Sequence, residues 1–268
     1  MKRFMSRLAI ATLVVGAGLV WGTQGAEAGN CDSRPTCSCG DTLQFGRTLT
    51  GADPVVNTVC TGEFALKIFG GGHITLDLGG RTIRCGGPNG ATQGIIIDAN
   101  MVTVQNGAIE NCAVGVTTAV PHDDLRIERI RAVRNGTGFM VQASRSGGGA
   151  NRLMDNIAEE NVGNGFAVEG FSTFLQENRC EQNGGHGMFV SGGNNHLTKN
   201  LCDYNEGDGI LVEGSATLLD NQARTNGGRG VFAPFGFNTP PDRLNYGNNN
   251  KTRPNCEING KTIQKKYC

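Results

Sequence analysis

Three side chains with complementary chemistry occur at one position of a repeated segment. His186, Asp208 and Arg229 each precede a glycine of the repeat, at steps of 22 and 21 residues. Equivalent residues stack in repetitive folds, so we expect His186 to hydrogen-bond to Asp208, with Arg229 beside that carboxylate. Such a group is suited to abstract a proton from a uronate, because the arginine neutralises the sugar carboxylate. The alternative is a set of polar turn residues that serve solubility alone.

His122, Asp123 and Asp124 form a second candidate group, directly after Pro121. A histidine beside aspartates can transfer a proton, and paired aspartates can bind Ca²⁺. The alternative is a polar surface loop between two structural units. No other cofactor is expected.

A repeated unit between Asn161 and Ala233 positions the first group. Asn-x-x-x-Gly-apolar-x-apolar occurs four times, and Leu-x-x-Asn recurs between the copies. A fixed period in this range indicates a solenoid, and Gly and Asn are poor helix formers that tolerate positive φ at turns. The sequence therefore predicts an all-β fold, a parallel β-helix of about 22 residues per coil, with coils stacked at roughly 4.8 Å.

The apolar-x-apolar strand of each repeat defines an inward and an outward face. Its two apolar positions point into the core, and the residue between them points outward. A solvated face should be polar, but this outward position is apolar in every copy. Its residues are Met140, Ala167, Phe189, Leu211 and Phe232. The stripe is either covered by the C-terminal tail or the Ser144–Ala150 loop, or serves self-association or sugar stacking, with Phe189, Leu211 and Phe232 as binding residues.

Ten cysteines, an even number behind a secretory signal, predict disulfides formed in an oxidising compartment. Cys180 and Cys202 hold the same place in adjacent copies, so stacking brings their Cα atoms to about 5 Å, within disulfide range. The other expected pairs are Cys85 with Cys112 and Cys256 with Cys268, while Cys31, Cys37, Cys39 and Cys60 lie together at the N-terminal end. Cys37-Ser-Cys39 is too tight for a zinc pair, and no metal site is expected there.

The first 28 residues have the features of a secretory signal peptide. Basic residues precede the apolar run Leu8–Val20, which is too short to span a membrane, and Ala26-Glu27-Ala28 is a cleavage site. Cleavage leaves 21 basic and 23 acidic residues without a basic run, so neither a nucleic acid nor a membrane is an expected partner. We expect a secreted or periplasmic protein. Its predicted organisation is signal peptide 1–28, disulfide-rich N-terminal cap 29–70, β-helix 71–233 and C-terminal cap or tail 234–268.

Residues 39–233 resemble the secreted bacterial right-handed parallel β-helix repeat proteins of the pectate-lyase-like superfold. The resemblance is carried by Cys39-Gly-Asp-Thr42 with the following Cys60, by Ile74–Ile83 and by the Asn-x-x-x-Gly coils. It implies a right-handed helix. The superfold includes polysaccharide lyases, glycosidases, uronate epimerases and adhesins.

Two short motifs are similar to catalytic motifs within that superfold. Pro121-His122-Asp123-Asp124 is similar to the Asp-Pro-His-Asp/Glu motif of alginate C5-epimerases, although Val120 stands where that motif has its first Asp. Gly185-His186-Gly187 is similar to a motif of polygalacturonases, whose other motifs are missing here.

Fold alone does not determine function, so three hypotheses follow. The first is a protein that contacts an extended polysaccharide along the helix without a catalytic site. The second is a polysaccharide lyase or uronate C5-epimerase that uses one of the two candidate groups. The third is a structural or adhesive surface protein, in which the outward stripe is an interface.

Overall fold

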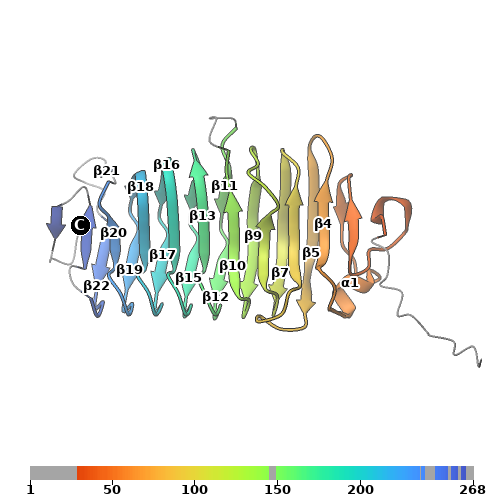
Figure 1. Cartoon of the computed structure of the whole chain (residues 1–268), viewed down its shortest axis with the longest axis horizontal. Helices are drawn as coiled ribbons and strands as arrows, with labels where there is room; N and C mark the ends of the chain where they lie inside the picture. The colour runs from red at the N-terminus through yellow and green to blue at the C-terminus, as the bar shows by residue number, and fades with distance from the viewer. Residues whose placement is uncertain are drawn as a thin grey trace, which may run out of the picture.

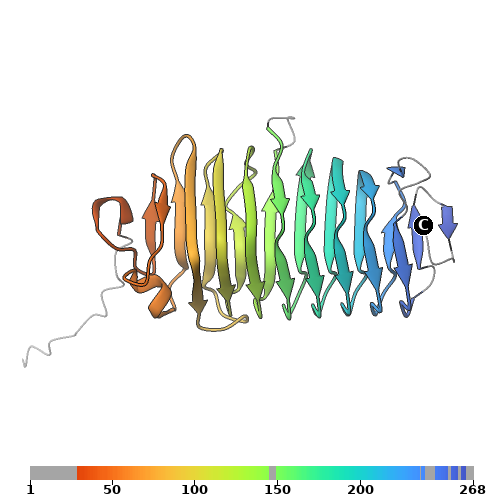
Figure 2. The same ribbon diagram turned by 180° about the vertical axis from the view of Figure 1, so that it is seen from behind.

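The computed structural model describes residues 29–144, 149–235, 237–238, 245–252, 255–258 and 261–263. The chain winds into a right-handed parallel β-helix, which confirms the predicted fold (Figure 1). Successive coils follow one another along the long axis of the molecule, and the view from behind shows the same single row of coils (Figure 2). The expected signal peptide lies outside the described residues.

Each coil contributes strands to three parallel sheets, named A, B and C in chain order. Sheet A contains β1 (Asp41–Leu43), β4 (Phe64–Phe69), β6 (Gln93–Asp98), β8 (Val114–Thr118), β10 (Thr137–Gln142), β13 (Phe166–Phe171), the first parts of β16 (Met188–Thr198) and β18 (Ile210–Leu219), β20 (Val231–Ala233) and β23 (Cys256–Ile258). The longest strands bend around a corner and so belong to two sheets.

Sheets B and C complete the triangular cross-section of each coil. Sheet B contains β2 (Arg47–Thr48), the first parts of β5 (Ile74–Cys85), β7 (Val102–Glu110) and β9 (Arg126–Val133), β11 (Arg152–Met154), β14 (Phe174–Gln176), the second parts of β16 and β18, and β21 (Phe237–Asn238). Sheet C contains β3 (Val59–Cys60), the second parts of β5, β7 and β9, β12 (Ile157–Glu159), β15 (Arg179–Glu181), β17 (Leu201–Asp203), β19 (Gln222–Arg224) and β22 (Tyr246–Asn248).

The two ends of the helix differ from its body. The 3₁₀ turn η1 (Cys31–Ser33) and the short helix α1 (Pro54–Asn57) lie at the N-terminal end, and β1 to β3 of the same segment already pair with β4 and β5. At the other end β24 (Lys261–Ile263) pairs antiparallel with β23, the only antiparallel pairing among the described strands. The segment expected as the N-terminal cap therefore also supplies a first coil.

The core consists of columns of apolar side chains, as the apolar-x-apolar pattern predicted. Phe166, Met188, Ile210 and Val231 are paired in register and fully buried. Phe139 precedes Phe166 in this column, and their rings stack with centroids 4.6 Å apart. This continuous apolar column explains why a unit that could not bury its apolar face alone is stable when stacked.

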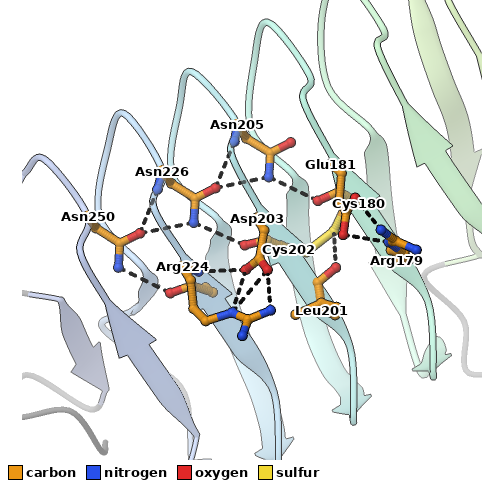
Figure 3. A network of polar contacts seen from close by, with 11 residues as sticks. Arg179, Cys180, Glu181, Leu201, Cys202, Asp203, Asn205, Arg224, Asn226 and Asn250 are labelled. Atoms are coloured by element: carbon orange, nitrogen blue, oxygen red, sulfur yellow. Dashed lines mark hydrogen bonds and ion pairs between the residues drawn. A yellow bond between two sulfur atoms is a disulfide. The ribbon is translucent and has the colours of Figure 1, made fainter.

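Buried asparagines form ladders at two corners of the coil. At the corner between sheets C and A, the Asn183 side-chain oxygen accepts from the backbone N–H of Asn161 on the preceding coil, at 3.2 Å, and its amide donates to the carbonyl of Ala158, at 3.1 Å. The ladder continues through Asn205, Asn226 and Asn250 (Figure 3). A parallel ladder at the corner between sheets B and C contains Asn156, Asn178, Asn200, Asn221 and Asn245.

The ladders correct the expectation that these asparagines turn the chain with positive φ. That conformation belongs to the residue before each asparagine, for example Gln182 at 55° and Tyr204 at 59°. The asparagine itself turns inward, because its amide can satisfy backbone groups that the corner would otherwise leave buried without a partner.

The repeat glycines also have a different cause from the one expected. Gly187 does not adopt positive φ; instead a Cβ there would lie 2.6 Å from the carbonyl oxygen of Gly209 and 2.7 Å from the amide nitrogen of Asn205. Glycine is therefore required because neighbouring coils and the asparagine ladder approach this backbone closely.

The corner between sheets A and B differs from the other two in its variable length. From β11 to β19 the corner from B to C has two residues in every coil, and from β12 to β20 the corner from C to A has six. By contrast, seven residues separate β8 from β9, nine separate β10 from β11, and two separate β13 from β14. The register shift between Gly192 and Asn195 also falls at the A-to-B corner.

Four disulfides join described cysteines. Cys180–Cys202 links adjacent coils, with the Cα atoms 4.5 Å apart, and Cys85–Cys112 spans one coil, as the spacing predicted. Cys39–Cys60 and Cys31–Cys37 close the N-terminal end; the sequence grouped these four cysteines but gave no connectivity. The expected partner of Cys256, Cys268, lies outside the described residues.

The outer face of sheet C carries ion pairs, as befits a solvated surface. Arg224 contacts both carboxylate oxygens of Asp203, and Arg179 does the same with Glu181 (Figure 3). The Asp203 carboxylate raises the pKa of Arg224 through their side-chain hydrogen bond. This polar face contrasts with the outer face of sheet A.

Candidate functional site

The outer face of sheet A carries the predicted apolar stripe. Met140, Ala167, Phe189, Leu211 and Phe232 are paired in register from β10 to β20, and we call them the central column. Met140 is 38% exposed, Phe189 and Phe232 are half-buried, and Leu211 is only 7% exposed between the two phenylalanines. The column is thus partly shielded by its own members.

His186, Asp208 and Arg229 do lie together, on the turn that enters sheet A. The expected side-chain hydrogen bond between His186 and Asp208 is absent. Instead His186 Nδ1 accepts from the backbone N–H of Asp208 at 2.9 Å, and Asp208 Oδ1 accepts from the backbone N–H of Arg229 at 2.6 Å. Asn164 accepts from the backbone N–H of His186 in the same way. The column is a ladder in which each side chain satisfies the backbone of the next coil.

The guanidinium of Arg229 is also engaged by neighbouring side chains. Its guanidinium pairs with Asp208 at 2.9 Å and lies over the ring of Phe232, 3.2 Å from the centroid. With the imidazole nitrogen, the carboxylate and the guanidinium all engaged, this group is built as a structural ladder, in line with the polar-turn alternative.

The side chains of His122, Asp123 and Asp124 have different environments. His122 is 9% exposed, its Nδ1 lies 3.2 Å from Asn100 Oδ1, and the same oxygen accepts from the backbone N–H of Asp123. The Asp123 carboxylate accepts from the backbone N–H of Ser144 at 3.3 Å, and Asp124 is exposed. The two aspartates therefore share no contact that would make them a proton-transfer pair with His122.

The side chains that face His122 come from earlier coils. Asp98, at the end of β6, has Oδ1 3.5 Å from His122 Nε2, and its Oδ2 is 2.8 Å from Lys67 Nζ. Neither Lys67 nor Asp98 was singled out from the sequence, because the coils that carry them are irregular. The hydrogen bond from Lys67 holds the pKa of Asp98 below its ordinary value of 3.8, with His122 acting in the same direction and burial opposing both.

This lowered pKa leads to a prediction for Asp98→Asn. Since the folded carboxyl titrates below its unfolded value, it stabilises the fold above about pH 4, and the contribution is lost as the pH falls through the folded pKa. At neutral pH the substitution should lower the unfolding temperature by a few degrees. The difference from the unmodified protein should disappear once the pH falls below the lowered pKa of folded Asp98, in thermal unfolding followed by circular dichroism. Asp124→Asn, at an exposed position that forms no ion pair with a described residue, should give no such pH-dependent difference.

A depression of about 510 Å³ lies at the C-terminal edge of sheet A. Phe171, which is 39% exposed, borders it together with Pro121, and Gln142, Glu169 and Ser191 supply polar groups. Gly170 and Gly192 form part of its lining, both at positive φ. A second depression of about 580 Å³ shares Gln142 and extends across Met140 and Thr117 toward Lys67 on β4.

The residues of the first depression were not predicted as a site from the sequence, although the repeat carries a signal for them. Gln142, Glu169, Ser191 and Glu213 each follow the second core position of the repeat, and they are paired in register. They form a second outward column, which we call the lateral column. Its polar residues lie directly beside the apolar central column.

The fold and this surface define a parallel β-helix protein with an elongated, partly apolar face. Residues 75–264 match the family described as periplasmic copper-binding protein (NosD), and the chain belongs to this family. No curated protein matches it. Among solved structures, the chain is similar to the A-module of the Azotobacter vinelandii mannuronan C-5 epimerase AlgE4, with 15% identity over 81% of this chain and 71% of that chain and a TM-score of 0.39. In the described part of the chain, no helix is long and apolar enough to cross a membrane.

The family description raises the question of copper, and the donor groups of the described residues do not fit a copper site. Copper sites in proteins use cysteine, methionine and histidine. Among the described residues no cysteine is free, and no three His, Cys, Asp or Glu side chains converge. His122 and His186 each have a ring nitrogen engaged within their own corner. We therefore derive no copper chemistry from these residues.

Proposed function

We propose that this NosD-family protein binds an extended carbohydrate chain along the outer face of sheet A. The observation that carries the proposal is the pair of depressions that meet at Gln142 and together cross the strands from β4 to β16. A linear polymer is the ligand whose shape matches a long, shallow surface that runs parallel to the stacking axis.

The lining of the first depression favours a carbohydrate. Phe171 offers an exposed aromatic ring, beside the amide of Gln142, the carboxylate of Glu169 and the hydroxyl of Ser191. An aromatic surface next to a few placed hydrogen-bonding groups is typical of ligand sites, and it suits a sugar ring with apolar C–H faces and hydroxyl edges. The glycines in the lining lack side chains and allow a ligand to approach the backbone.

Binding without chemistry is favoured over a lyase or epimerase reaction. A general base must reach the proton that it removes, but the Nε2 atom of His122 is buried and faces Asp98. The other candidate group, formed by His186, Asp208 and Arg229, already binds backbone and side-chain partners.

Titration calorimetry with hexasaccharides of neutral sugars, amino sugars and uronates tests the proposal. At least one hexasaccharide should bind, and Phe171→Ala should weaken that binding about tenfold, equivalent to about 1.4 kcal/mol. Phe45→Ala removes an aromatic ring near the N-terminal end that is even more exposed than Phe171, and it should leave the affinity unchanged.

Two results would contradict the proposal. If no hexasaccharide binds, or if Phe171→Ala binds as well as the unmodified protein, the carbohydrate site is not on sheet A. If uronates give unsaturated products or C5 proton exchange, the protein is an enzyme, and the lyase or epimerase alternative replaces the binding role.

A further inference from the structure

We infer that the carbohydrate chain bound on sheet A is built from amino sugars that carry positive charge, and is not a uronate polymer. The inference rests on the proposed binding face and specifies its substrate class. It follows from the charges on that face, from their spacing and from the absence of free cations beside them.

The lateral column presents carboxylates that no cation of the described residues neutralises. Glu169 and Glu213 are both exposed, and neither forms an ion pair with any described residue. Glu63, at the far end of the second depression, is also exposed and without an ion pair in the described part of the chain. A ligand on this surface therefore meets negative charge along its length.

The cations of the same face are already paired. Within and directly before the described strands of sheet A, the outward Lys and Arg side chains are Lys67 and Arg229, and these contact Asp98 and Asp208 respectively. A uronate carboxylate would find no free arginine or lysine there and would be repelled by Glu169 and Glu213. An ammonium group would be attracted to the same carboxylates.

The spacing of the two carboxylates suits a sugar chain that runs along the helix. Glu169 and Glu213 are related through Ser191, so they stand two rungs apart, roughly 9.6 Å at the usual strand separation. In an extended chain whose sugars alternate in orientation, the same edge recurs at every second sugar, over a comparable length. One amino group could therefore meet each carboxylate while Phe171 contacts a ring between them.

Three hexasaccharides separate the contributions of shape and charge. The hexamer of glucosamine at about pH 6 carries ammonium groups, its N-acetylated counterpart has the same backbone without charge, and an oligouronate has negative charge. In calorimetry at low salt, the glucosamine hexamer should bind several-fold more tightly than the N-acetylated one, and the oligouronate most weakly. Added salt should reduce the difference, because both carboxylates are exposed to solvent.

The double variant Glu169→Gln/Glu213→Gln should remove the preference for glucosamine, so that the glucosamine hexamer binds no more tightly than the N-acetylated hexamer to the same variant. The matched control is Asp155→Asn/Asp220→Asn, which removes two negative charges at the corner between sheets B and C, where asparagine tolerates the positive φ of both residues. It should keep the preference.

The possible failures are distinct. Equal or tighter binding of the N-acetylated hexamer or of the oligouronate, or a preference that persists in the glutamine variant, would overturn the assignment to amino sugars while the binding face stands. If none of the three hexamers nor a neutral hexasaccharide binds, the proposed function itself fails, and this inference with it.

Discussion

Asn183→Ala should lower the free energy of unfolding by roughly 3 kcal/mol or more, the largest effect we expect from a single substitution. The substitution removes an oxygen that accepts from the backbone and side-chain amides of Asn161, and an amide that donates to Ala158 and Asn205. All these groups are buried, so those left behind lose a partner and cannot turn to water. Guanidinium denaturation followed by circular dichroism measures the loss.

Two further variants make this prediction specific to the ladder. Asn183→Asp keeps the accepting oxygen but not the donating amide, so an intermediate loss is expected even if the alanine variant does not fold. Asn57→Ala removes an exposed asparagine of α1 and should change stability by less than about 1 kcal/mol. Equal losses at positions 57 and 183 would show that the ladder has no special role.

Gly187→Ala should destabilise the protein by about 3 kcal/mol, the upper part of the usual range for overpacking, although alanine favours ordered backbone over glycine in general. The added Cβ would lie 2.6 Å from the Gly209 carbonyl oxygen and 2.9 Å from the Cβ of Cys202. Its neighbours are backbone and a disulfide-bonded residue, so they cannot move aside without separating two coils.

Gly71→Ala is the matched control for this substitution. Gly71 has no atom within 4 Å of a built Cβ and does not adopt positive φ. Its replacement should be neutral or slightly stabilising in the same denaturation experiment. A Gly187→Ala variant as stable as the Gly71→Ala variant would contradict the close-approach explanation for the repeat glycines.

The features that could be predicted from the sequence are those that recur at a fixed period. The core column from Phe166 to Val231 and the Cys180–Cys202 bond follow from the period alone, because equivalent positions of neighbouring coils must stack. The period also placed His186, Asp208 and Arg229 together. It could not indicate that their polar atoms bind the backbone, since turn conformation decides which atom each side chain reaches.

The remaining features depend on irregular coils, or on the conformation and length of individual corners. Asp98 precedes His122 by 24 residues in a region without a clear repeat, so nothing in the sequence pairs them. Asparagine is equally suited to a left-handed turn and to a buried ladder, and the composition does not distinguish the two. Phe171 stands just outside the repeated motif, at a corner whose length varies from coil to coil.

The unequal corners of the coil bear on how such a protein can change through evolution. In the corners that carry the asparagine ladders, each buried amide must reach backbone groups of the neighbouring coil, so insertions beside a ladder asparagine should be disfavoured. The corner between sheets A and B has buried asparagines in some coils but no Asn-to-Asn ladder among the described residues, and it already accommodates between two and nine residues from β8 to β14. It is also the corner that borders Pro121, Phe171 and Gly192. Relatives can therefore diversify in what they recognise by lengthening or shortening this one edge, while the scaffold that supports it stays the same.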